Sequence, residues 1–389
     1  MMSLLVESLE SLRKDGLKCA KGIAEWYVNN QVRYKDYIHA AGSFPAAISF
    51  IGQPSGGVTN WQLAFAAMGQ IAAGRAFNCD LYNYSAEKMI FYLRSLQIFD
   101  PYLPRHYGAI REMTALTPWC YIKDAITGAW GFLEYYQVTG NEEYLRRAEL
   151  WTEWYFREGV DQQGLPLWGV EFAPPLSEGT PPMLNDMLGD FTGGILNFFY
   201  RMYQITGNRR YIDSRFEDFA EFYIANAKQP DGFFKTVFKA DGRVPDKDPQ
   251  GGLHKSNDDF SSLGMLAAYR VTGKKYFLDA VHDFIEAVFA IQRPDGSFEQ
   301  SCAGIPVVLN ILLESEGELG PWPKSRLEQA AEALRALYKR QDPGDIFPNK
   351  RGALDEYSDG VVCTRSSAYA LIVLLKLFAG EDRFLSAAK

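Results

Sequence analysis

The sequence predicts an all-α protein: an (α/α)6 barrel of six inner and six outer helices, formed by one domain over residues 1–389. Three observations support this class. A helical hairpin repeats at a nearly constant spacing, apolar helices alternate with amphipathic ones, and the long connections all fall between the same kinds of helix.

The repeat is clearest in the segments "AWGFLEYYQVTGNEEYL", "ILNFFYRMYQITGNRRYI" and "LGMLAAYRVTGKKYFL". Each has an apolar helix, a Thr-Gly pair, a charged pair, a tyrosine and an amphipathic helix. The Thr-Gly pairs fall at 139–140, 206–207 and 272–273, so the steps are 67 and then 66 residues. Each glycine stands where a helix commonly ends in a left-handed residue. A weaker copy lies near Gly380.

The first helix of each hairpin is apolar on nearly all sides, so we expect it inside, and the second is charged on one face, so we expect it outside. Extended along the chain, this pattern predicts inner helices near 61–75, 125–138, 190–205, 259–271, 303–315 and 364–379. It predicts outer helices near 4–29, 83–97, 142–157, 209–228, 274–292 and 324–340.

The connections are unequal in length. Inner-to-outer turns are short, whereas outer-to-inner connections are mostly long, at about 30–60, 98–123, 158–189, 229–258 and 341–363. Long loops inside a domain are usually functional. We therefore expect the deepest cleft at the N-termini of the inner helices, where these loops would gather.

Aspartates recur at the starts of the predicted inner helices. Asp124, Asp190 and the adjacent Asp258 and Asp259 precede their Thr-Gly pairs by 15, 16, 14 and 13 residues. Each could simply cap its helix. As a set, they should surround one end of the barrel, and two carboxylates across a cleft are what glycoside hydrolysis requires. We predict these four as catalytic residues.

Further charged and aromatic residues lie on the same predicted loops. Cations there indicate a carboxylated or sulfated ligand, and aromatic side chains can stack on sugar rings. The predicted substrate-binding residues are Asp186, His254, Lys255, Arg105, His106, Tyr107, Trp61, Trp168 and Arg365. Additional loop acids are Glu171, Glu299, Asp355 and Glu356.

The composition excludes some functions. A net charge of −8 argues against a nucleic-acid partner, which needs a basic surface. Five dispersed cysteines suit a reducing compartment and give no zinc signature. No signal peptide is evident, and no apolar run reaches the ~18 residues needed to span a membrane. We expect a cytoplasmic enzyme with an oligosaccharide substrate and without metal, cofactor or membrane contact; no oligomeric state is indicated.

The segment "DFTGGILNFFYRMYQITGN" and the aspartate positions resemble the six-hairpin glycosidases, most nearly the unsaturated glucuronyl and rhamnogalacturonyl hydrolases. The resemblance implies that Asp190 is the principal acid and base, with Asp124 as a second acid. It also implies that the enzyme protonates an enol-ether double bond, so that water adds and an unsaturated uronic acid is released. Asp186, four residues before Asp190, would raise the pKa of Asp190 by repulsion. The chain departs from the family in lacking its His- and Trp-rich segments near these acids.

Four other functions stay open. A polysaccharide lyase on this barrel would use Tyr107 or His106 as its base. An epimerase of the N-acylglucosamine type would need paired histidines on inner helices, and the chain has only His39, His106, His254 and His282. "QPDGFF" and "QRPDGSF" resemble the Q-x-x-D-G-x-W repeats of terpene cyclases, but no D-x-D-D motif appears. A non-catalytic glycan-binding barrel would need aromatic residues but no cluster of acids.

Overall fold

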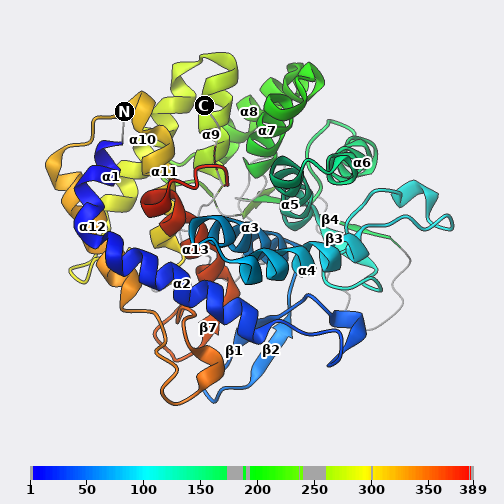
Figure 1. Ribbon diagram of the computed structural model, residues 1–389. Helices are drawn as coiled ribbons and strands as arrows, with labels where there is room; N and C mark the ends of the chain where they lie inside the picture. Colours follow the sequence, from blue (N-terminus) through cyan, green and yellow to red (C-terminus); the bar gives the residue numbers. More distant parts are fainter. Residues whose placement is uncertain are drawn as a thin grey trace. The chain divides into compact units, whose positions relative to one another are not determined.

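The protein is described as a computed structural model covering residues 3–172, 187–189, 193–235, 237–239, 260–298, 301–384 and 386 (Figure 1). The chain forms two compact units. The first contains Met1–Val58, Phe65–Tyr92 and Ile285–Ser386, and the second contains Thr59–Ala64, Leu93–Phe284 and Ala387–Lys389. The single domain expected from the sequence stays a prediction.

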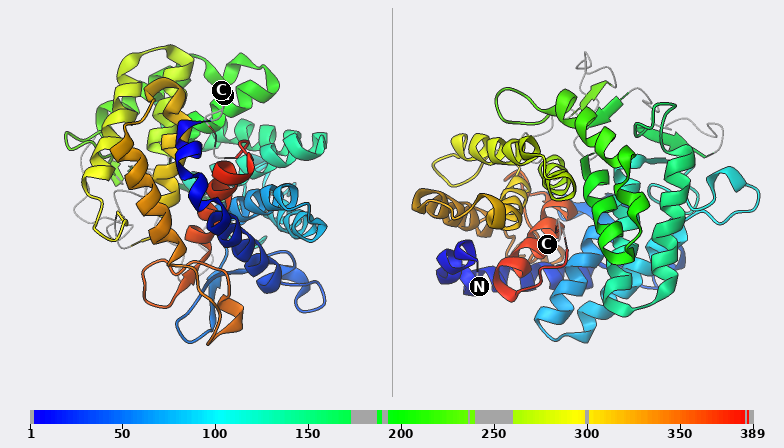
Figure 2. Two further views of the ribbon diagram at one scale, coloured as in Figure 1. Left: turned by 60° about the vertical axis from the view of Figure 1, so that its left-hand side comes forward. Right: turned by 90° about the horizontal axis from the view of Figure 1, so that it is seen from above.

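The first unit contains helices from both ends of the chain. They are α1 (Leu4–Leu9), α2 (Arg13–Asn30), most of α3 (Asn60–Ala76) and α4 (Asp80–Leu96), the end of α10 (Lys275–Ala290), α11 (Gly304–Leu319), α12 (Lys324–Tyr338) and α13 (Thr364–Ala379). A small antiparallel sheet has the order β2 (Pro54–Gly57), β1 (Pro45–Ile48), β7 (Val362–Cys363). Helix α1 lies beside α12, and α2 packs on α13 (Figures 1 and 2).

The second unit contains the repeated hairpins. Its helices are α5 (Ile122–Thr139), α6 (Glu142–Glu158), α7 (Gly194–Thr206), α8 (Ser214–Ala227) and α9 (Ser261–Thr272), with most of α10. Two short antiparallel ladders join β3 (Trp119–Tyr121) to β4 (Gly169–Glu171) and β5 (Met187–Gly189) to β6 (Val237–Lys239). Helix α5 packs on α6 and α7, and α7 packs on α9.

The predicted alternation of buried and half-exposed helices is confirmed. Within the described residues every predicted helix has a counterpart, with ends shifted by a few residues. The predicted outer helix 209–228 is divided into a 3-10 turn at Arg209–Ile212 and α8. In the inner helix α13, Thr364 and every residue from Ser366 to Phe378 are buried, whereas the outer helix α12 buries only one face. The predicted outer helix 4–29 is divided into α1, a 3-10 turn at Glu10–Leu12 and α2.

The Thr-Gly repeat forms one kind of turn wherever it occurs. At the end of α5, Gly140 adopts a left-handed φ of 68°. The Thr139 hydroxyl donates to the carbonyl of Tyr135 at 2.8 Å and accepts from the Asn141 N–H at 3.3 Å. Asn141 then caps α6 by accepting from the Glu143 N–H at 3.1 Å. A single tripeptide therefore ends one helix and starts the next.

The starts of α7 and α9 lie against each other. A Cβ on Gly264 would lie 2.3 Å from the carbonyl oxygen of Gly193, so only glycine permits this approach. Two of the predicted inner helices therefore begin side by side. Across the described residues, no helix combines the length and the apolar character needed to cross a bilayer.

Candidate active site

The most unusual chemical feature of the described residues is a pair of buried carboxyl groups. Asp124 lies in the first turn of α5 and is 4% exposed, and Glu112 lies on the preceding loop and is 1% exposed. Burial raises the pKa of Glu112 well above its usual range, and the charge of Asp124 and a hydrogen bond shared with that side chain raise it further. The loop acid therefore retains its proton where an exposed glutamate would lose it.

Backbone contacts fix Glu112 in place. Its N–H donates to the carbonyl of Trp119 at 3.1 Å, and its own carbonyl accepts from the Asn60 N–H at 2.8 Å. One carboxyl oxygen, Oε2, accepts from the Tyr121 N–H at 2.9 Å. The other, Oε1, and Oδ1 of Asp124 are buried without a donor from any other described residue. Because burial and the charge of Asp124 both raise the pKa of Glu112, the loop acid is the member of the pair that retains a proton.

A lysine and three aromatic rings lie next to the acid pair. Lys123 places its Nζ 3.8 Å from Oδ1 of Asp124. The same ammonium lies 5.7 Å from the ring centre of Tyr121 and 5.5 Å from that of Trp168. Trp119 and Tyr121 contact each other with ring centres 4.9 Å apart. The pairing of β3 with β4 aligns these residues, since β3 leads directly into α5.

The predicted residues Arg105, His106 and Tyr107 lie on a 3-10 turn and the residue after it. Arg105 is exposed and pairs with Glu158, and Tyr107 packs on Phe99. Burial lowers the pKa of His106, and neighbouring arginines lower it further, against the opposing effect of Glu158. Its imidazole is therefore neutral at pH 7, and its Nδ1 is buried without a partner in the described part of the chain.

A second buried acid lies in the first unit. Glu356 is 3% exposed, and its Oε1 accepts from the Ser301 hydroxyl at 2.9 Å and lies 3.6 Å from a guanidinium nitrogen of Arg365. Ser301 immediately precedes the turn into α11, and Arg365 lies in the first turn of α13. The predicted residue Arg365 and the predicted loop acid Glu356 therefore meet at the N-termini of two inner helices.

The remaining predicted residues have different positions. Trp61 is half-buried at the start of α3, and Glu171 is half-buried on β4 opposite Trp119. Seven predicted residues lie outside the described ones: Asp186, Asp190, His254, Lys255, Asp258, Asp259 and Glu299. The expectation that four aspartates surround one cleft thus stays a prediction.

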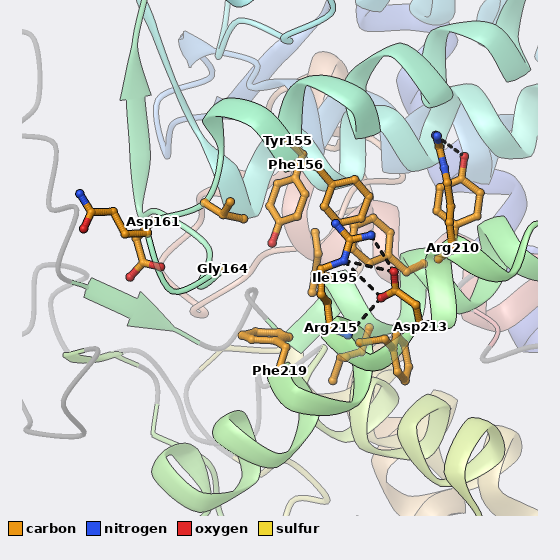
Figure 3. Close-up of a pocket in the computed structure, with 15 residues that line it drawn as sticks. Tyr155, Phe156, Asp161, Gly164, Ile195, Arg210, Asp213, Arg215 and Phe219 are labelled. Atoms are coloured by element: carbon orange, nitrogen blue, oxygen red, sulfur yellow. Dashed lines mark hydrogen bonds and ion pairs between the residues drawn. The ribbon is translucent and has the colours of Figure 1, made fainter.

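A cavity of about 240 Å³ lies between α6, α7 and α8 (Figure 3). Tyr155, Phe156 and Phe219 contribute aromatic walls, and Arg215 forms an ion pair with Asp213 at 2.7 Å on one side. None of the predicted site residues lines this cavity. Within the described ranges, no group of three His, Cys, Asp or Glu side chains is arranged to hold a metal ion.

Comparison with solved structures supports the fold class. The cellobiose 2-epimerase from Spirochaeta thermophila matches with a TM-score of 0.70 at 14% identity, over 97% of this chain and 99% of that one. The cellobiose 2-epimerase from Bacillus thermoamylovorans matches with a TM-score of 0.70 at 12% identity, over 94% and 98%. An α-1,6-mannanase of glycoside hydrolase family 76 from Salegentibacter sp. has a TM-score of 0.65 at 13% identity, over 94% and 99%.

These similarities show the fold: the chain is an (α/α)6 barrel of the type shared by these sugar epimerases and mannanases. An inactive form of the Salegentibacter mannanase, with Asp-to-Asn changes at two consecutive positions, was solved with α-1,6-mannotriose, and it matches with a TM-score of 0.63 at 13% identity, over 94% and 99%. No protein-family model matches the chain, and no curated protein is similar to it in sequence. The resemblance to unsaturated glucuronyl hydrolases stays a prediction.

Proposed function

We propose that this protein is a carbohydrate-active enzyme, a glycoside hydrolase in which Asp124 exchanges a proton with the substrate and Glu112 positions that proton. The observation that carries the proposal is the buried pair of carboxyl groups at the start of α5, with the pKa of Glu112 raised. Cleavage of a glycosidic bond needs a carboxylic acid that is still protonated near neutral pH. An acid pair sharing one proton meets this requirement.

The two acids have different roles in this proposal. Glu112 is the deeper of the two and is anchored to the Tyr121 N–H, so it holds the proton without leaving its place. Asp124 stands on the first helical turn, takes the proton from Glu112 and passes it to the leaving oxygen, after which both carboxyls are ionised. Lys123, 3.8 Å from Asp124, balances the negative charge that remains on the pair after the transfer.

A second carboxylate must activate water or attack the sugar. We propose Asp190, with Asp186 beside it in sequence, or the adjacent Asp258 and Asp259 for this task. The consecutive pair just ahead of α9 is supported by the mannanase form that is inactive with two consecutive aspartates replaced.

The surroundings of the acid pair support a sugar as the substrate. Trp119 and Tyr121 are partly exposed aromatic rings beside the acids, and such rings stack on the apolar face of a pyranose. Lys123 lies over this surface and would attract a carboxylated sugar. These contacts support the uronic-acid-containing oligosaccharide that the sequence suggested.

A sugar epimerase is the second candidate. Two observations favour it: the similarity of the fold to cellobiose 2-epimerases and the neutral, partly buried imidazole of His106. An epimerase removes and returns a proton at one carbon, and a neutral histidine is a suitable base for that step.

The test is an activity panel with matched variants. Purified protein is offered unsaturated uronic disaccharides, α-1,6-mannotriose and cellobiose, and the products are separated by chromatography. Glycoside cleavage supports the hydrolase, conversion of cellobiose to an epimer supports the second candidate, and no turnover of any of the three refutes both.

On the substrate that is turned over, Asp124→Asn should lower kcat by about 10²–10⁴-fold, the usual contribution of a positioned acid or base. Asp100→Asn is the matched control, because Asp100 lies on the same long loop and its carboxylate accepts from the nearby Tyr102 N–H at 2.8 Å, a bond that an asparagine oxygen can also accept. It should keep full activity. A normally folded Asp124→Asn variant with unchanged kcat would remove the acid pair from the mechanism.

A further inference from the structure

The first unit contains a larger cavity, of about 770 Å³, that the proposed function does not use. It lies between the end of α2, the loop at residues 31–42 and one face of α4. Its lining comprises Val28, Gln31, Val32, Arg33, Tyr34, Lys35, Ala41, Gly42, Leu81, Tyr84, Ser85, Lys88 and Phe91. This volume lies within the range of small-molecule sites. We call it the α2–α4 pocket.

The loop wall of the pocket is fixed to α4. The Gln31 side-chain amide donates to the carbonyls of Gly42 and Ser85, each at 3.0 Å. Gly42 has a φ of 97°, and a Cβ on it would lie 2.1 Å from the carbonyl oxygen of Lys88. The loop therefore approaches the helix as closely as a backbone can. The pocket is preformed by these contacts.

The face of α4 that lines the pocket is unlike that of an ordinary outer helix. Leu81, Tyr84, Lys88 and Phe91 are spaced three or four residues apart and therefore share one side of the helix. Leu81 is 54% exposed, Tyr84 57% and Phe91 39%. Tyr34, on the opposing loop, is 72% exposed. Such a gathering of uncovered apolar groups usually marks a binding site.

The charge in the pocket has one sign. Arg33, Lys35 and Lys88 line it, and no aspartate or glutamate does. None of these cations forms an ion pair with a carboxylate of the described residues. The Nζ of Lys88 lies 4.6 Å from the ring centre of Tyr84 and 4.8 Å from that of Phe91. On a chain of net charge −8, a purely cationic pocket favours an anion.

We propose that the α2–α4 pocket binds a small organic anion with a flat, apolar body. The anionic group is held by Lys88, with Arg33 and Lys35 adding to the attraction. The flat body lies against Tyr84 and Tyr34. The site is independent of the acid pair, so it stands whether or not the protein is a glycosidase.

The test uses two dyes with the same skeleton. 8-Anilinonaphthalene-1-sulfonate carries an anionic group on a flat apolar body, and N-phenyl-1-naphthylamine is that body without the sulfonate. Fluorescence titration of the folded protein should show saturable binding of the anionic dye. Lys88→Gln should raise its Kd about tenfold, as expected for one lost charge-assisted contact, and change that of the neutral dye little.

Arg215→Gln is the matched control, since it makes the same charge change at the cavity between α6, α7 and α8. It should leave the Kd of the anionic dye unchanged. Tyr84→Ala is the second variant, and it should weaken both dyes. If Lys88→Gln leaves the Kd of the anionic dye unchanged, or if Arg215→Gln weakens it as much, the proposal is overturned.

Competition then identifies the flat body. Phenyl phosphate and glucuronate both carry an anion, on an aromatic ring and on a sugar ring respectively. Displacement of the anionic dye by phenyl phosphate supports the site, whereas displacement by glucuronate alone contradicts the flat, apolar body. Displacement by neither, or sedimentation showing that the dye follows self-association of the chain, overturns it.

Discussion

The raised pKa of Glu112 makes the stability of the folded protein depend on pH in a direction that can be worked out. The folded state binds this proton more tightly than the unfolded state, where a glutamate titrates near 4.5. The resulting stabilisation is fully present below that value and is lost as pH rises through the raised folded pKa. Glu112→Gln removes the titration.

The size of the effect follows from proton linkage. One proton bound only in the folded state changes the free energy of unfolding by about 1.4 kcal/mol for each pH unit. A chain of 389 residues unfolds with an entropy of roughly 0.8 kcal/mol per kelvin near its melting temperature. The acid pair should therefore lower the melting temperature by about 2 °C for each unit that pH rises above the ordinary glutamate range.

Glutamine can replace the protonated glutamate almost atom for atom. Its Oε1 accepts from the Tyr121 N–H, as the carboxyl does at 2.9 Å, and its Nε2 donates to Asp124. We therefore expect Glu112→Gln to melt close to the wild type at pH 5 and above it at pH 8. Thermal melts of both proteins across this pH range give the difference between their melting temperatures. The other titrating groups contribute equally to both proteins and cancel in this difference.

For Asp100→Asn, on the same loop, the difference in melting temperature from the wild type should not change with pH. A melting-temperature difference between Glu112→Gln and the wild type that does not grow with pH would refute the shared proton. The catalytic role given to the pair would then lose its physical basis.

The remaining predictions concern other buried contacts. Arg201 donates to both carboxylate oxygens of the fully buried Glu134, at 2.8 and 3.0 Å. Arg201→Met leaves that charge without its partner, so the free energy of unfolding, measured by denaturant titration, should fall by about 3–5 kcal/mol. Adding Glu134→Gln to this variant should recover part of the loss. The lowered pKa of His106 stabilises the folded state above the ordinary histidine range, and this stabilisation is lost as pH falls through the folded pKa; in an NMR titration, His106 should protonate below 6.5. Gly264→Ala should destabilise by more than Gly140→Ala, because a Cβ at Gly140 meets nothing within 4 Å and one at Gly264 meets a backbone oxygen; equal melting temperatures would contradict this reasoning.

The fold could be predicted because its signals are local. Helix ends are encoded by the Thr-Gly pair, and the side on which each helix is buried is encoded by its own apolar pattern. The same local signals placed Asp124 in the first turn of α5. The short strands β3 and β4 were missed because three-residue ladders have too few positions to show a pattern.

Glu112 could not be found this way. It lies twelve residues before Asp124 on a connection without periodicity, and it meets that aspartate only because the loop folds back onto α5. A possible signal is the composition of "REMTALTPWCYIKD", where one acid precedes aromatic residues, a lysine and an aspartate. The α2–α4 pocket was equally hidden, since the sequence predicts residues 83–97 only as an outer helix and does not show which loop packs against it.

The Thr-Gly-Asn turn also bears on how such a chain arises. Every hydrogen bond that closes the turn joins residues within a few positions of each other, so its geometry needs no partner from another hairpin. A duplicated hairpin would therefore carry all the residues that form its own turn. The long connections between hairpins are not fixed by these hydrogen bonds, so they can change in length or composition while the Thr-Gly-Asn turns keep their geometry. A chain built this way can lengthen by whole hairpins and acquire new chemistry in the segments between them.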